Sequence, residues 1–174
     1  MSIQLTYSGN LGWIRESTTI ANGILSSEEF FNMIADTPGT YDDIKPADLS
    51  PADIAGFFRN SSLRLDVREY TDDDPDVGGE FRWKTPNSLW ANIGNGRRGC
   101  TYAAVLIHEC VHALSYHTPG ADFTHPYSSG DENYDGSNSD TAPYTIQRQT
   151  RESFCREDFT LKEDLIEVKV DESE

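Results

Sequence analysis

The sequence is poor in the features that would suit a membrane or a nucleic acid. It contains 14 Lys and Arg against 30 Asp and Glu, so its formal net charge is −16. Such a charge repels phosphates and anionic membranes, and it attracts basic partners. No stretch approaches the roughly 18 apolar residues of a membrane-spanning helix, and the first residues do not resemble a signal peptide. We therefore expect a soluble protein with neither a nucleic-acid nor a membrane partner.

Cysteine is also scarce, with three residues at Cys100, Cys110 and Cys155. Because three is an odd number, at least one thiol stays unpaired within a monomer, and Cys100 with Cys155 is the first pair to test. Cys110 is expected to be a packed thiol rather than a metal ligand. Three cysteines leave the compartment open. A cytoplasmic protein, a mature secreted form and an exported effector all fit.

The chain of 174 residues suits one domain, 1–174, with its own hydrophobic core. The order of predicted elements is that of an α+β fold with a small mixed sheet and one buried helix. The last residues, 171–174, form an acidic tail. The patterns predict strands at 3–7, 63–67, 80–84, 88–93 and 166–170, and helices at 27–35, 51–58, 101–116 and 147–155.

Two of these helices carry start signals. Ser26 stands three residues before Glu29, which predicts a capping box at the helix over 27–35. Ser50 followed by Pro51 is an N-cap with proline at the first helical position. The helix over 101–116 is instead marked by apolar residues on nearly every side, which is typical of a buried helix.

The buried helix carries a His-Glu-x-x-His motif at His108, Glu109 and His112. Residues four apart on a helix lie one above the other, so both imidazoles can reach one Zn²⁺ at about 2.0–2.1 Å. Glu109 is placed to act as general base on a water molecule beside the metal. A short motif can also arise by chance. However, burying these three side chains without a partner such as a metal would be costly.

The third metal ligand is open among Asp122, His117 and His125. The metzincin pattern requires Gly where Ser115 stands and His where Thr118 stands, so that class is disfavoured. His117 follows His112 by five residues, which directs it away from the ligand face if the helix continues.

Residues 120–128 read Gly-Ala-Asp-Phe-Thr-His-Pro-Tyr-Ser, and this segment resembles the Gly-Thr-x-Asp-x-x-Tyr-Gly segment of the deuterolysin-like aspzincins. Residues 138–144 are similar to the Asn-Ala-Asp-Ser-Tyr-x-Tyr segment of that family. The resemblance covers 101–144 and implies a zincin-like fold and zinc endopeptidase activity on proteins, and it allows a preference for basic ones. It also implies Asp122 as third zinc ligand and Tyr127 as a residue that stabilises the oxyanion.

Two other functions fit the same motif. One is a catalytically inactive or structural zinc-binding module that acts as a binding or effector protein, although a structural site needs no carboxylate such as Glu109. The other is a metal hydrolase that acts on small amides or esters rather than on proteins.

Three further segments have a possible role around this site. The strand over 88–93 is expected at the sheet edge, where a substrate could add as a further strand, although a core strand fits the same residues. The acidic stretches at 72–76 and 131–140 are interpreted as solvated loops rather than calcium sites, because neither has EF-hand spacing.

Overall fold

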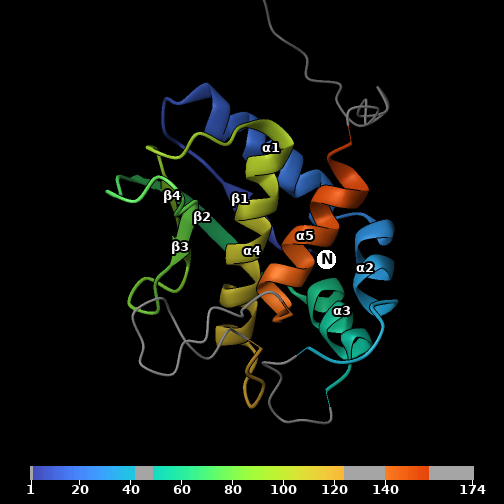
Figure 1. The fold of residues 1–174 in the computed structure, drawn as a ribbon. Helices are drawn as coiled ribbons and strands as arrows, with labels where there is room; N and C mark the ends of the chain where they lie inside the picture. Colours follow the sequence, from blue (N-terminus) through green and yellow to red (C-terminus); the bar gives the residue numbers. More distant parts are fainter. Residues whose placement is uncertain (1, 42–48, 124–139, 157–174) are drawn as a thin grey trace, which may run out of the picture.

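A computed structural model describes residues 2–41, 49–123 and 140–156 of the chain. These residues form an α+β fold with a four-stranded mixed sheet and five helices (Figure 1). The strands are β1 (Gln4–Thr6), β2 (Arg64–Tyr70), β3 (Gly79–Phe81) and β4 (Ser88–Asn92), and the helices are α1 (Gly12–Leu25), α2 (Glu28–Ala35), α3 (Pro51–Asn60), α4 (Gly99–His117) and α5 (Ala142–Phe154). The predicted strand at 166–170 and the acidic tail lie outside the described residues. Within the described ranges, no helix is long and apolar enough to cross a membrane.

The strand order in the sheet is β1-β2-β4-β3. The first three strands run parallel, and β3 runs antiparallel to β4. The prediction that 88–93 forms an edge strand is therefore wrong, because β4 is flanked on both sides and the edge beside α4 is β3. The burial of the strands agrees with this order, since four of the five β4 residues are buried while those of β3 are half-buried or exposed.

The opposite edge of the sheet, at β1, is covered by a side chain of α1. Asn22 accepts a hydrogen bond from the backbone N–H of Leu5 at 2.8 Å and donates one to the carbonyl oxygen of Leu5 at 2.9 Å. One amide side chain thus satisfies both backbone groups that this residue turns away from β2.

Helix α4 lies between the sheet and α5 (Figure 1). Residues 102–111 are all buried, so α4 is enclosed on every side as its apolar sequence predicts. Over this stretch it therefore holds the polar residues His108 and Glu109 inside the molecule.

The helix starts differ in part from the predictions. The N-cap of α2 is Ser27, whose side chain accepts a hydrogen bond from the N–H of Phe30, so the capping box predicted at Ser26 and Glu29 is wrong. A capping box does form at α3, between Ser50 and Asp53. Helix α1 was not predicted.

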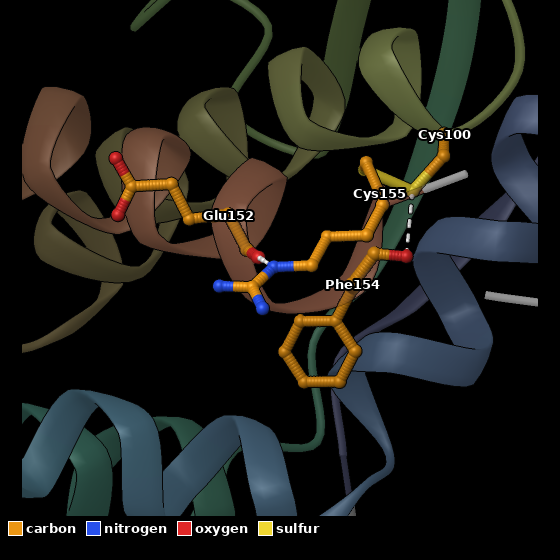
Figure 2. The surroundings of a disulfide bond; sticks show 5 residues. Cys100, Glu152, Phe154 and Cys155 are labelled. Atoms are coloured by element: carbon orange, nitrogen blue, oxygen red, sulfur yellow. Dashed lines mark hydrogen bonds between the residues drawn. A yellow bond between two sulfur atoms is a disulfide. The ribbon is translucent and has the colours of Figure 1, made fainter. Parts of the chain in front are cut away.

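A disulfide joins Cys100 in the first turn of α4 to Cys155 directly after α5 (Figure 2). The predicted pair is confirmed. The guanidinium of Arg156, the next residue, donates to the carbonyl oxygen of Glu152 at 2.6 Å and occupies an acceptor of the last turn of α5. Cys110 is a free, buried thiol, as predicted, and burial raises its pKa. The disulfide fixes α5 against the helix that carries the motif.

Candidate metal and catalytic site

His108 and His112 lie one turn apart on α4 and direct their rings toward the same point. Their Nε2 atoms are 3.2 Å apart, and their ring centroids are 5.0 Å apart. A tetrahedral Zn²⁺ with bonds of about 2.0–2.1 Å separates two of its ligand atoms by about 3.3–3.4 Å. The two imidazoles are therefore spaced as two ligands of one zinc ion are spaced.

Glu109 is buried next to this pair, and it faces the edge strand β3. The pKa of Glu109 is raised to about 8, mainly by burial; the nearby backbone N–H of Phe81 lowers it, and the charge of Glu80 adds to the rise. Such a carboxyl group is poised to exchange a proton near neutral pH.

Two glycines allow β3 to approach α4 this closely. A Cβ atom on Gly78 would lie 2.8 Å from a methyl group of Val105. A Cβ atom on Gly79 would lie 3.1 Å from the carbonyl oxygen of Trp90 and 3.4 Å from Cγ of Glu109. The hydroxyl of Tyr102 donates to the carbonyl oxygen of Gly78 at 2.7 Å and fixes the start of the strand. The edge strand can thus contact the motif helix only because Gly78 and Gly79 have no side chains.

The acidic loop before β3 is held in place by polar side chains at the end of β4 and directly after it. The amide of Asn92 donates to the carbonyl oxygen of Val77 at 2.8 Å, and that of Asn95 donates to the carbonyl oxygen of Pro75 at 2.7 Å. Both asparagines are buried. The guanidinium of Arg97 donates to the carbonyl oxygen of Asp76 at 3.1 Å. The loop expected at 72–76 is therefore present, and its backbone is anchored.

The motif opens into a cleft of about 670 Å³ between β3, the acidic loop and α5. Asp74, Asp76 and Glu80 line it with carboxylates, opposite the residues of α4. From α5 come Tyr144 and Gln147, and the ring of Tyr144 packs edge-on against that of His108 with centroids 4.7 Å apart. The residues described as lining the cleft include one phenol, that of Tyr144.

These acidic and α5 residues had no predicted role in the site. The acidic loop precedes α4 by more than twenty residues, and no spacing rule relates it to the motif. Tyr144 had one signal in the sequence, since it ends the second segment that resembles the aspzincins.

The candidates for a third ligand are placed differently. Asp122 is exposed, and it lines a smaller pocket together with His112. His117 ends α4, and its Nε2 lies 3.1 Å from the carbonyl oxygen of Pro86. His125 and the predicted oxyanion residue Tyr127 lie outside the described residues. Within those residues, no three His, Cys, Asp or Glu side chains are grouped closely enough to bind a metal ion.

No model of a protein family matches this chain, and neither a curated protein nor a solved structure is similar enough to count as a match.

Proposed function

We propose that the protein is a zinc-dependent endopeptidase with a zincin-like fold. The observation that carries this proposal is the 3.2 Å separation of the His108 and His112 Nε2 atoms beside the buried carboxyl group of Glu109. Asp122 remains the proposed third ligand, and Tyr127 remains a proposed oxyanion residue. A Zn²⁺ ion bound there would polarise the scissile carbonyl group and make an attacking water more acidic.

The edge strand is suited to present a peptide to this site. The N–H of Asn92 bonds to the carbonyl oxygen of Gly78 across the ladder from β4. Because pairing alternates along antiparallel strands, the backbone groups of Gly79 and Phe81 face away from β4. An extended substrate can pair with these groups, and its scissile bond then lies beside α4.

Two side chains of the chain then take part in the chemistry, and a third positions one of them. Glu109 removes a proton from the attacking water and later delivers it to the nitrogen of the leaving amine. The hydroxyl of Tyr144 donates a hydrogen bond to the oxygen of the scissile carbonyl group as negative charge develops there. His108, against which Tyr144 packs, keeps that phenol at the site.

The carboxylates of Asp74, Asp76 and Glu80 support a preference for basic peptides, because they share the cleft with the motif. Peptides that carry Lys or Arg near the cleaved bond are expected to have a higher kcat/KM than neutral peptides, and the difference should shrink as salt is added. If basic and neutral peptides are cleaved at equal rates at low salt, the proposed preference for basic peptides is wrong.

The test of the function is the Glu109→Ala variant, with Glu16→Ala on the exposed face of α1 as control. Peptide hydrolysis should fall by about 10²- to 10⁴-fold in Glu109→Ala while bound zinc is retained. Glu16→Ala should match the unmodified protein in both respects. A protein that binds zinc and cleaves neither peptides nor small amides and esters would instead be a structural or binding module. Turnover of small amides or esters alone would indicate a nonpeptidase hydrolase.

A further inference from the structure

A second pocket adjoins the catalytic cleft on the far side of Phe81. It has a volume of about 320 Å³ and is lined by Phe81, His112, Ser115, Tyr116, Ala121 and Asp122. Phe81 and His112 also line the main cleft. The two cavities therefore meet at a proposed metal ligand and at the edge strand on which a substrate would lie.

The walls of this pocket are aromatic and are held by neighbouring contacts. The rings of Phe81 and Tyr116 pack at a tilt with centroids 5.7 Å apart. Tyr116 is more than half exposed, yet its ring also packs edge-on against His117, which is itself bonded to Pro86. An exposed ring that is braced in this way offers a preformed apolar surface.

The remaining wall, residues 118–123, is anchored to α4 as well. The hydroxyl of Ser115 accepts a hydrogen bond from the N–H of Phe123 at 3.0 Å. Phe123 is fully buried and stacks on Phe57 with centroids 6.0 Å apart. Ala121 follows on this anchored segment and presents only a methyl group, which leaves room between it and Tyr116.

We propose that this pocket binds one bulky apolar side chain, aromatic or leucine-like, of the peptide that is cleaved. This inference rests on the proposed peptidase function and adds a second determinant of specificity to it. The acidic residues at one end of the site select basic side chains, and the Phe81–Tyr116 pocket at the other end selects an apolar one. The substrate is accordingly a peptide with basic and bulky apolar residues on either side of the cleaved bond.

The experiment uses a peptide series in which each position near the cleaved bond is Phe, Leu, Ala, Lys or Asp. At one position, Phe and Leu should exceed Ala in kcat/KM by about tenfold or more. Ala121→Leu fills the pocket and should reduce this preference to within about threefold while Ala peptides are still cleaved. Tyr116→Ala removes a wall and should weaken the same preference. The control is Trp83→Ala, since Trp83 is an exposed aromatic residue that lines neither cavity.

Binding measured with Glu109→Ala separates the pocket from the chemistry. Fluorescence anisotropy should show tighter binding of the Phe peptide than of the Ala peptide, and Ala121→Leu should remove the difference. Selective binding without hydrolysis by the unmodified protein would contradict the peptidase function and leave the pocket in place. Hydrolysis with no preference for Phe or Leu, or with a preference for Lys that Ala121→Leu abolishes, would overturn the pocket. If the protein neither binds nor cleaves these peptides, both the pocket and the peptidase function are overturned.

Discussion

The sheet ends in two edge strands, β1 and β3, and their surroundings differ. At β1, the amide of Asn22 occupies the outward N–H and carbonyl oxygen of Leu5. At β3, two glycines bring the strand against the motif helix, and the buried carboxyl group of Glu109 lies beside it. An edge strand normally has to be protected from further pairing. Here one edge is covered by a fixed side chain, and the other faces a cleft with an ionisable partner.

This difference separates stability from function. Loss of the Asn22 contact would leave the backbone N–H and carbonyl oxygen of Leu5 without a partner, so this contact stabilises the fold. At β3, the neighbour of the edge strand is the carboxyl group of Glu109, which can gain or lose a proton, so this edge forms part of the site. Substitutions at β1 should therefore change mainly the free energy of unfolding, whereas substitutions at β3 should also change the rate of hydrolysis.

The largest effect is expected from the disulfide that holds α5 opposite β3. Replacing Cys100 and Cys155 with Ala opens a loop with a sequence separation of 55. The chain-entropy relation predicts a loss of about 4 kcal/mol in the free energy of unfolding. Urea unfolding measures it, and the reduced unmodified protein should unfold at the same urea concentration as the variant. Equal stability with and without the bond would show that α5 is held by packing alone.

Removal of the hydroxyl of Tyr144 should affect hydrolysis and spare the fold. In Tyr144→Phe we expect kcat to fall by about 100-fold, as for the loss of one oxyanion donor. The ring contact with His108 is kept, so zinc affinity and stability should be unchanged. Rates within a factor of about two of the unmodified protein would remove Tyr144 from the chemistry and return that role to Tyr127.

Opening the protected edge should affect the fold and spare the chemistry. Asn22→Ala leaves the N–H and the carbonyl oxygen of Leu5 without their partner, and we expect it to cost about 2–3 kcal/mol in the free energy of unfolding. Asn22→Asp keeps the acceptor for the N–H and should lose less. Hydrolysis per folded molecule should not change in either variant. A fall in kcat would show that the two edges are coupled.

Crowding the cleft edge should affect both properties. In Gly78→Ala, the added methyl group meets Val105, and we expect a loss of about 1–2 kcal/mol and slower hydrolysis as β3 moves from Glu109. The control is Gly56→Ala within α3, where a Cβ atom has no neighbour within 4 Å. It should be neutral or stabilising by up to about 1 kcal/mol. A neutral Gly78→Ala would contradict the close packing of β3.

The smallest effect is expected at a helix cap far from both edges. Ser50→Ala should cost about 1 kcal/mol at neutral pH, whereas Ser26→Ala, which removes only an exposed hydrogen bond to the carbonyl oxygen of Gly23, should change little. Hydrogen bonds from the hydroxyl and the backbone N–H of Ser50 lower the pKa of Asp53 below its ordinary 3.8. The folded state therefore binds that proton less readily than the unfolded chain. The contribution of Asp53 is present above pH 3.8 and is lost as the pH falls through the folded-state value, so the Ser50→Ala penalty should shrink there. A penalty that does not change with pH would contradict this cap.

The parts of the fold that the sequence predicts are those with a local signal. The apolar run around His108 identifies α4, the alternation of Leu65 and Val67 identifies β2, and Ser50 with Pro51 identifies the start of α3. Helix α1 escaped prediction because Ser17, Thr18 and Thr19 are weak helix formers. In the structure, their hydroxyls bond to backbone carbonyl oxygens one turn earlier.

The order of the strands had no local signal, because partners in a sheet are distant in sequence. The edge was therefore assigned to 88–93 rather than to Gly79–Phe81. For the same reason, the spacing of the motif predicted that His108, Glu109 and His112 lie together. No spacing rule placed Asp74, Asp76 and Tyr144 beside them, because these residues reach the cleft only through tertiary packing.

The central claim is that His108 and His112 together bind one metal ion, and zinc titration of the metal-free protein tests it most directly. Isothermal titration calorimetry should show one Zn²⁺ bound per chain, and His108→Ala and His112→Ala should each abolish that binding while the circular dichroism spectrum stays the same. A protein that takes up no zinc, or that binds it equally well without both imidazoles, would contradict the account.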